Sequence, residues 1–364
     1  MKKILLPILI IGIIGVGYLT LSKKPEDVGQ TESQATQNLS SNTLSSTAPS
    51  STSSSQQSGD SVQEAFQKAL SQTSADSSVY EDISASEKYT SSDEAIAALK
   101  AGAKDYDDLT LQHFVELGDC AWCNDLYNSL QTLVKETTDE DEMGYYAEAL
   151  AVSGKPENIA FLVQGIQSET NEDRKDILAE ALELTVGGED VVNYLIGFTS
   201  DNDELLRESA VAAISNQGSL LAAQHLYELA VKNNDPDGYY SLGIGLGEMI
   251  PDEEAFGFLQ ESLMKRDAYA HLAAKALINA GLPGLAITID VLSNVQNEKL
   301  EQDILDGAFD HVAYDEETEA YLTKLQEQSK IPYIKDWASK VLKDFSLDED
   351  DEDFDDDEDE DDTQ

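Results

Sequence analysis

This chain has 364 residues, of which 41% are hydrophobic, and a formal net charge of −49 at pH 7. So strong an acidic excess excludes nucleic acid as a ligand, because phosphates and carboxylates repel each other. It is compatible with a basic protein or a cation as partner, and also with the plain role of keeping a long exposed fold soluble. The two ends differ so much in composition from the middle that the globular part is shorter than the chain.

The first stretch, Ile4–Leu21, contains no charged residue and has lysines on both sides. As a helix it would be about 27 Å long, which just spans the hydrocarbon core of a bilayer. Only Gly15 and Gly17 suit a signal cleavage site, and no cysteine follows for lipid attachment. We therefore predict an uncleaved membrane anchor over residues 1–24, with a cleaved signal as the alternative. The two ends of this stretch carry equal numbers of lysines, and the positive charge of the free amino terminus adds to the first end. We therefore predict that the amino terminus lies inside and the body on the extracytoplasmic (periplasmic) side.

Two segments of low apolar content follow the anchor. Residues 25–60 are mostly Ser, Thr, Gln and Asn, a composition that cannot bury enough surface to offset chain entropy. They predict a disordered linker. Residues 61–90 are also expected to be mostly disordered, although Ser61–Leu70 has apolar residues at helical spacing and is compatible with one short helix.

Two helices are expected at the start of the body. Ser91 followed by Glu94 has the pattern of a capping box, which predicts a helix that runs to Gly102. Asp108 predicts the start of a second helix, which continues to Gly118.

Cys120 and Cys123 belong to the sequence Cys-Ala-Trp-Cys, the one motif here whose spacing indicates a specific reactivity, thiol–disulfide exchange. Asp119 is placed to cap the next helix, so the first cysteine would face a helix amino end, where the dipole stabilises a thiolate. A thioredoxin-like site needs a strand before that helix, and the preceding residues have a helical pattern. We expect a local disulfide or two buried thiols, oxidised if the body lies outside the cytoplasm. A redox role is the alternative.

A small residue followed by a large apolar one recurs through the rest of the body at steps of 31 to 33 residues. The pairs are Ala149-Leu150, Ala181-Leu182, Ala213-Ile214, Gly245-Leu246, Ala276-Leu277, Ala308-Phe309 and Val341-Leu342. Large apolar pairs such as Phe161-Leu162 and Phe258-Leu259 form a second series with a similar period. This period, without the alternation of strands, indicates stacked repeats that bury their apolar faces against each other.

Each unit is expected to hold two helices joined by a short polar turn, as in Glu157–Gln167 and Glu172–Val186. The predicted fold class is therefore all-α. It is an alpha-solenoid of about seven two-helix repeats within a body that spans residues 91–345.

One second helix carries a run that is shared with a known repeat family: Asp201, Asp203, Arg207, Ala210, Ala213 and Ile214, with Arg174, Ala181 and Leu182 as a partial match one unit earlier. The run resembles that of HEAT-like repeats, and the resemblance covers about Asp119–Phe345. It implies the alpha-solenoid architecture. Families of this kind are mostly scaffolds and adaptors, with some chromophore lyases among their relatives.

Other candidate chemistry has a simpler explanation. The four histidines lie in different predicted helices without an i, i+4 partner, which favours packing or surface positions over metal binding: His113, His225, His271 and His311. Gly243, Gly245 and Gly247 fall inside a predicted helix with no strand before it, which favours close helix packing over a phosphate loop. We predict no catalytic residue, no metal and no cofactor.

Positions −5, −1 and +2 from each small anchor residue share one strip of the second helix, whereas −4, −3 and +1 belong to the core. In chain order the strip contains Asp176, Glu180, Glu183, Glu208, Ala212, Ser215, Tyr240, Ile244, Gly247, His271, Lys275, Ile278, Asp303, Gly307, Asp310, Asp336, Lys340 and Lys343. An apolar centre with charged flanks is typical of a contact site with an aromatic anchor. We predict that this strip lines the concave side and that Tyr240, Ile244, His271 and Lys275 contact a partner. A merely variable surface, or packing on the next unit, is the alternative.

The chain ends in a strongly acidic segment, residues 346–364. Between Asp348 and Asp362 only Phe354 is not acidic, so like charges repel at every spacing and we predict a disordered tail. Weak capture of a cation or a basic protein is an alternative role for it.

These features predict a membrane-tethered, non-catalytic HEAT-like scaffold that binds a protein or peptide partner, with a basic one favoured by the charge. The alternative is an envelope thiol–disulfide oxidoreductase or redox sensor that uses Cys120 and Cys123.

Overall fold

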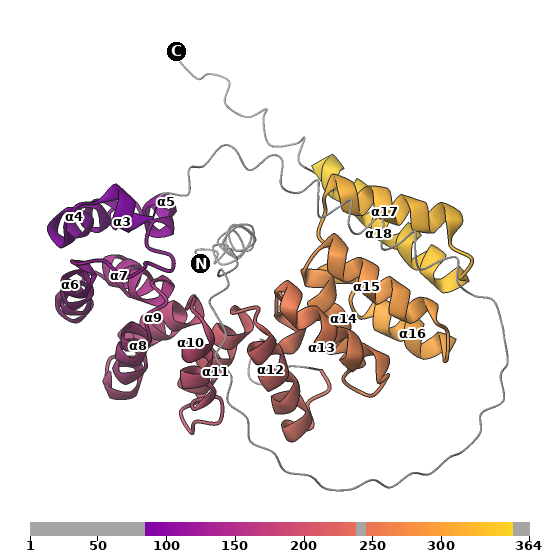
Figure 1. Ribbon diagram of the computed structural model, residues 1–364, viewed down its shortest axis with the longest axis horizontal. Helices are drawn as coiled ribbons and strands as arrows, with labels where there is room; N and C mark the ends of the chain where they lie inside the picture. The colour runs from indigo at the N-terminus through magenta and orange to yellow at the C-terminus, as the bar shows by residue number, and fades with distance from the viewer. Residues whose placement is uncertain (1–83, 238–244, 352–364) are drawn as a thin grey trace, which may run out of the picture. The chain divides into compact units, whose positions relative to one another are not determined.

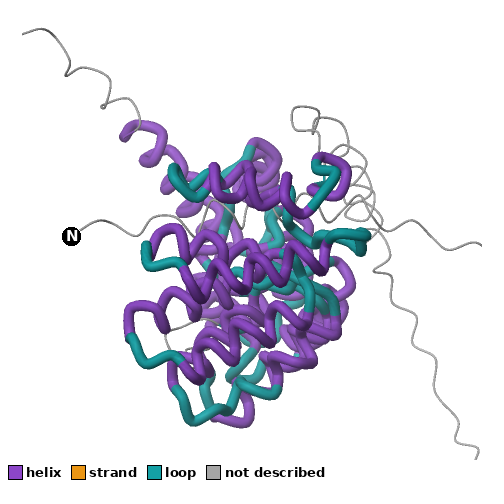
Figure 2. The backbone as a smooth tube through the Cα atoms, turned by 90° about the vertical axis from the view of Figure 1, so that its left-hand side faces the viewer, coloured by secondary structure: helices purple, strands orange, loops and turns teal. Residues whose placement is uncertain are grey.

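A computed structural model describes residues 84–237 and 245–351 of the protein, with side chains up to residue 346. Every described residue belongs to one unit of the chain, Ile83–Gln364. Within these ranges all regular structure is helical and no strand occurs (Figures 1 and 2). The predicted all-α class is confirmed for this part of the chain.

The helices of the described part follow one another with short connections. In chain order they are α3 (Ala85–Lys88), α4 (Ser92–Gly102), α5 (Asp108–Gln112), α6 (Cys123–Glu136), α7 (Glu140–Val152), α8 (Pro156–Ser168), α9 (Glu172–Glu183), α10 (Glu189–Ile196), α11 (Glu204–Ser215), α12 (Leu220–Asn233), the 3₁₀ helix η2 (Leu246–Glu248), α13 (Glu253–Met264), α14 (Ala270–Asn279), α15 (Leu282–Ser293), α16 (Glu298–Asp306), the 3₁₀ helix η3 (Phe309–His311), α17 (Glu316–Gln328) and α18 (Pro332–Asp351).

Successive helices pack in two rows, as Figure 1 lets the reader follow. The first-helix row consists of α6, α8, α10 and α12, followed by α13, α15 and α17, each in contact with the next. In the second-helix row, α7 contacts α9 and α9 contacts α11 before residues 238–244, and α14, α16 and α18 contact one another in order after them. Within a unit the two helices also pack together, as α6 does on α7 and α13 on α14. The packing therefore repeats with the period of the sequence.

Second helices of three consecutive units begin at equivalent caps. Asp139, Asn171 and Asp203 are spaced by one repeat, and each side chain accepts a hydrogen bond from the backbone N–H three residues later. Such a cap contributes about 1 kcal/mol. Acidic residues in the first turn of α7, α9 and α11 suit the positive end of the helix dipole. The repeat is thus encoded in the helix starts as well as in the core.

The small anchor residues lie in the core. Five of them are at most 1% exposed: Ala149, Ala181, Ala213, Ala276 and Ala308. Gly284 shows how close the helices approach, because a Cβ atom at this position would lie 1.6 Å from the backbone oxygen of Leu277. Small residues therefore set the spacing between helices, and the larger apolar side chains fill the volume around them.

Arg174 links two successive units. Its guanidinium donates to the backbone carbonyls of Thr137 and Val134, at 2.8 and 2.9 Å, at the C-terminal end of α6. These carbonyls have no partner inside their own helix, so the arginine satisfies them. Arg207, one unit later and one residue further from its helix cap than Arg174, donates to the backbone oxygen of Asp201 at 3.0 Å. The arginines of the HEAT-like run thus have a structural task here.

Two predicted helices differ from what the described residues show. The helix expected from Asp108 to Gly118 stops at Gln112, because Glu116 adopts a positive φ and its N–H donates to the Val152 backbone oxygen. Gly245 is extended rather than helical, and only the short η2 follows it. Closely spaced glycines each destabilise a helix by about 1 kcal/mol, which accounts for this difference.

Two described helices extend into the neighbouring predicted segments. The short α3 lies in the segment 61–90 that was predicted to be mostly disordered, and Tyr89 after it stacks on Phe114 with ring centroids 5.8 Å apart. At the other end, α18 continues to Asp351, past the predicted start of the tail at residue 346. Extension of an existing helix needs no new nucleus, so it proceeds into the acidic segment.

The predicted membrane anchor over residues 1–24, the linker 25–60 and the short helix within Ser61–Leu70 lie outside the described residues. So does the acidic tail beyond Asp351. Among the helices of residues 84–237 and 245–351, none combines the length and the apolar character needed to cross a bilayer.

Candidate functional site

The strip predicted on the second helices is surface in some units and core in others. Glu180 on α9 is exposed, as expected. Ala212 and Ser215 on α11 and Ile278 on α14 are at most 1% exposed. Residues of neighbouring units cover the second helices at these positions. For example, the Ser215 hydroxyl donates to the Gly245 backbone oxygen at 3.0 Å. The strip is therefore not one continuous surface.

Tyr240 and Ile244, the predicted centre of the contact site, fall within residues 238–244 and lie outside the described residues. The described chain ends at Asp237 after α12 and resumes at Gly245. The role of both residues in contacting a partner stays a prediction.

His271 and Lys275 lie one turn apart on α14, and both are half-buried. Burial lowers the pKa of His271 and the charge of Lys275 lowers it further, while Asp237 acts in the opposite direction. His271 is therefore neutral at pH 7. Lys275 is the cationic side chain of this helix.

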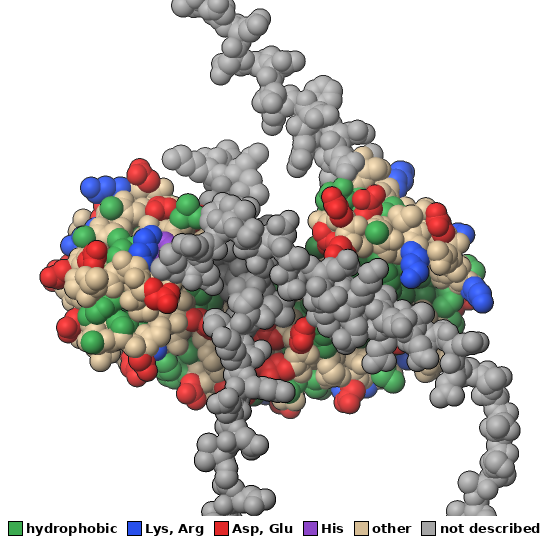
Figure 3. Space-filling view, turned by 45° about the horizontal axis from the view of Figure 1, so that its top comes forward, with side chains coloured by type: hydrophobic (Ala, Val, Ile, Leu, Met, Phe, Trp, Pro, Cys, Tyr) green, Lys and Arg blue, Asp and Glu red, His purple; other side chains and the backbone are tan. Residues whose placement is uncertain are grey.

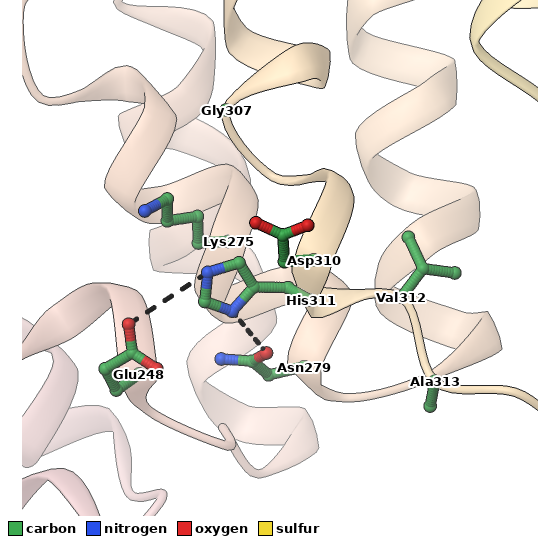
Figure 4. A pocket seen from close by; sticks show the side chains of 8 residues that line it. All are labelled: Glu248, Lys275, Asn279, Gly307, Asp310, His311, Val312 and Ala313. Carbon is green, nitrogen blue, oxygen red and sulfur yellow. Dashed lines mark hydrogen bonds and ion pairs between the residues drawn. The ribbon is translucent and has the colours of Figure 1, made fainter. Parts of the chain in front are cut away.

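Lys275 also lines an open depression of about 520 Å³, drawn in Figure 4. We call it the α14 depression, and its lining consists of Glu248, Lys275, Asn279, Gly307, Asp310, His311, Val312 and Ala313. Three successive units contribute charged side chains: Glu248 from η2, Lys275 from α14 and Asp310 from η3. The structure thus brings Lys275 together with Asp310 of the predicted strip, and adds Glu248 and His311, which were not assigned to a site.

A ladder of polar contacts forms one wall of the α14 depression. His311 Nδ1 lies 2.9 Å from Asn279 Oδ1, and the Asn279 amide nitrogen donates to the backbone oxygens of Gly247 and Met249 at 2.9 and 3.2 Å. Because Asn279 Oδ1 is an acceptor, it fixes the imidazole proton on Nδ1. Burial lowers the pKa of His311, against the opposing effect of Glu248, whose Oε1 is 4.0 Å from Nε2. The imidazole is therefore neutral at pH 7 and held in one tautomer.

The α14 depression offers charge and shape for recognition. Lys275, His311 and Asp310 line it together. Among the described residues, no group of three or more His, Cys, Asp or Glu side chains is arranged to hold a metal ion. The arrangement can bind the charged and polar groups of another molecule.

The cysteine motif lies in the turn before α6. Cys120 and Cys123 are joined by a disulfide, and Cys123 is 3% exposed. The predicted cap is wrong: α6 begins at Cys123 after Trp122, without a side-chain cap. Asp119 instead forms an ion pair with Lys155 at 2.9 Å, which draws it away from the helix. The second cysteine, not the first, therefore occupies the helix amino end.

A row of carboxylates at the opposite end of the second-helix row was missed. Glu148 on α7 accepts a hydrogen bond from the Tyr106 hydroxyl, and its other oxygen is buried without a partner among the described residues. Glu148 lies at position −1 from the anchor Ala149. It therefore continues the predicted strip by one unit, before its first residue Asp176. Extending the strip by a single repeat would have found it. Acidic side chains are also spread over the face shown in Figure 3, with lysines and arginines between them.

The chain matches no family model, and no curated protein matches it significantly. The resemblance to HEAT-like repeats therefore rests on the run from Asp201 to Ile214, on the repeat period and on the packing of helices in two rows.

Proposed function

We propose that this protein is a non-catalytic HEAT-like repeat scaffold that binds a protein or peptide partner along its second-helix row. The α14 depression carries the proposal, because charged side chains of three successive units line one preformed hollow. Solenoids bind in this manner, with each unit contributing a few side chains to an extended surface. No cofactor, metal or reaction is part of the proposal.

The partner that fits this surface is a segment with basic groups. Glu248 and Asp310 would accept them, and the net charge of −49 favours the approach of a cation from a distance. Lys275 would pair with an acidic group and set the register. Tyr240 and Ile244 are proposed to add apolar contacts to the same partner, from their place in the predicted strip.

We place the scaffold on a membrane, with the body on the extracytoplasmic side. The support is the uncharged stretch Ile4–Leu21 between lysines, followed by a Ser-rich linker that would let the body move. The bonded pair Cys120 and Cys123 suits an oxidising compartment. Labelling of the two thiols in intact cells by a membrane-impermeant maleimide, after reduction, tests this placement.

Site-specific photo-crosslinking in intact cells tests the scaffold. A photoreactive residue at Lys275 should form a discrete adduct with a particular protein, and one at the exposed Lys324 on the first-helix row should not. Glu248→Lys with Asp310→Lys should reduce the amount of the same partner that co-purifies about ten-fold or more, because it replaces the two carboxylates that would accept basic groups. Equal adducts from both positions, or no adduct from either, would contradict the proposal.

A thiol–disulfide exchange enzyme or redox sensor is the second candidate, favoured by the disulfide at the start of α6. The 3% exposure of Cys123 leaves Cys120, which is half-buried, as the sulfur open to attack. A Cys123→Ser variant should then trap a mixed disulfide through Cys120 in cells. Absence of any trapped partner would remove this candidate.

A further inference from the structure

Five carboxylates on four alternate helices form what we call the acidic seam: Asp108 on α5, Glu148 on α7, Glu180 and Glu183 on α9, and Glu208 on α11. The helices that carry them pack on one another in order, α5 on α7, α7 on α9 and α9 on α11. The seam therefore follows the contacts between units, at a distance in sequence from the α14 depression.

Glu148 is the most enclosed member. The Tyr106 hydroxyl donates to its Oε1, and the ring of Tyr106 packs edge-on against Tyr145 with centroids 5.3 Å apart. Its Oε2 is buried without a hydrogen-bond partner among the described residues, and so is Oδ1 of Asp108. A buried oxygen without a donor is costly, and a negative charge on it is more so. Burial raises the pKa of Glu148 to about 7, and Asp108 and Glu180 raise it against the effect of the Tyr106 hydrogen bond.

Glu183 lies one unit further along the seam. The Ser209 hydroxyl of α11 donates to its Oε1 at 3.4 Å, and the Asn216 amide donates to its backbone oxygen at 2.6 Å. Burial raises the pKa of Glu183 to about 7, with Glu180 and Glu208 acting in the same direction. A contact between α9 and α11 therefore holds a second carboxyl that resists ionisation.

In the part of the chain that the structure describes, no lysine or arginine is paired with Glu148 or Glu183. The lysine and arginine of α9 are used elsewhere: Lys175 pairs with Asp203 at 2.7 Å, and Arg174 pairs with Glu169 and caps α6. Within the described ranges neither Glu148 nor Glu183 forms an ion pair. The charged groups that act on them from the packed helices are carboxylates only, namely Asp108, Glu180 and Glu208.

We propose that the acidic seam is a proton-sensitive joint between the first repeats, which is firm when Glu148 and Glu183 carry protons and loosens when both are ionised. A protonated carboxyl carries no charge and can itself donate a hydrogen bond, so protonation of Glu148 removes the negative charge from its buried Oε2, which has no donor among the described residues. Ionisation places like charges between α7, α9 and α11 without a counter-charge. The inference concerns the stability of this part of the fold, and stands whether or not the second-helix row binds a peptide.

The direction of the pH effect follows from linkage. Both carboxyls bind protons more tightly in the folded than in the unfolded chain, whose Glu pKa is near 4.5. Their contribution to stability is therefore fully present below about pH 4.5 and is lost as the pH rises through about 7. Between pH 5.5 and 8, each group should change the unfolding equilibrium about ten-fold or more.

Urea denaturation of the full-length protein at several pH values between 5.5 and 8 tests the joint. The wild-type midpoint should fall as the pH rises. The midpoint of the double variant Glu148→Gln with Glu183→Gln should fall less over the same pH range. This variant should be more stable than wild type at pH 8, because glutamine keeps the shape of the side chain without the charge. The control is Glu189→Gln, at an exposed position of α10. The midpoint of this variant should fall with pH in parallel with that of wild type. Parallel curves for the double variant would overturn the proposal.

A second measurement covers the case in which the variants do not fold. Hydrogen exchange of wild-type protein should show amides of α7, α9 and α11 losing protection between pH 5.5 and 8, after correction for the intrinsic rate, while α13 and α15 keep theirs. Equal changes in both groups of helices would overturn the proposal, since general charge repulsion would explain them.

Discussion

The guanidinium of Arg266 and the carboxylate of Glu301 lie 3.0 Å apart across two successive units, and the Glu301 side chain is completely buried. Arg266 follows α13, whereas Glu301 belongs to α16. Arg266 also donates to the backbone oxygens of Val291 and Asn294 at the end of α15, both at 3.0 Å. One side chain thus joins three helices, and it neutralises a charge that would otherwise be buried alone.

Removal of the positive charge should therefore destabilise the fold strongly. Arg266→Met should lower the free energy of unfolding by about 3–5 kcal/mol, since it leaves the buried Glu301 carboxylate without its partner. Addition of Glu301→Leu should restore at least about 1 kcal/mol, because the second change removes the unpaired charge. Urea denaturation at pH 7 measures both changes.

The matched control is the exposed pair of Lys340 and Asp306, at 3.3 Å with side chains 57% and 42% exposed. Lys340→Met should change the free energy of unfolding by less than about 1 kcal/mol, because solvent screens this pair. Equal effects of Lys340→Met and Arg266→Met would contradict a special contribution of the buried ion pair between Arg266 and Glu301.

Gly284 should not tolerate even one added carbon. A Cβ atom would lie 1.6 Å from the Leu277 backbone oxygen, and a backbone atom cannot move aside as a flexible side chain can. Gly284→Ala should therefore separate α14 from α15 and lower the free energy of unfolding by about 3 kcal/mol or more.

Gly257 offers the control, since it is also in a helix, α13, and has nothing within 4 Å of an added Cβ atom. Gly257→Ala should raise the free energy of unfolding by about 0.5–1 kcal/mol, because alanine has the higher helix propensity. Thermal denaturation of the two variants should thus give shifts of opposite sign. Shifts of the same sign would show that the close approach at Gly284 does not control the packing.

The sequence predicts features of this fold that recur with the repeat. The anchors Ala181 and Ala213 are buried as expected, and the cap at Ser91 accepts from the Glu94 N–H at 3.3 Å. The anchors belong to a pattern that recurs along the body, so chance matches are averaged out, whereas the cap depends only on the local spacing of Ser91 and Glu94. The packing of helices in two rows follows from the same pattern.

Features that occur once were not predictable in this way. The pair of Arg266 and Glu301 joins positions that have no counterpart in the other units, so no period points to it. Burial of Ala212 and Ser215 depends on how far each unit turns relative to the next, which no single helix encodes. The α14 depression likewise depends on how η2, α14 and η3 pack together, which is set by contacts between units.

Asn279 should hold one wall of the α14 depression in place. Its amide donates to the Gly247 and Met249 backbone oxygens in and beside η2, and its Oδ1 lies 2.9 Å from His311 Nδ1. Asn279→Ala should lower the free energy of unfolding by about 1–3 kcal/mol, because two carbonyls lose their donor. Asn279→Asp should lower it further at pH 7, since a carboxylate would face two carbonyl oxygens and cannot donate.

Acid should partly rescue the Asn279→Asp variant, because a protonated carboxyl can donate to one of the two carbonyls while Asn279→Ala has no group to protonate. The difference between the two variants should therefore shrink from pH 7 to pH 5 in urea denaturation. Asn193→Ala at an exposed position of α10 is the control, with an expected change below about 0.5 kcal/mol at either pH. If Asn279→Asp were as stable as wild type at pH 7, the ladder would not support the depression, because the bonds to Gly247 and Met249 would be dispensable.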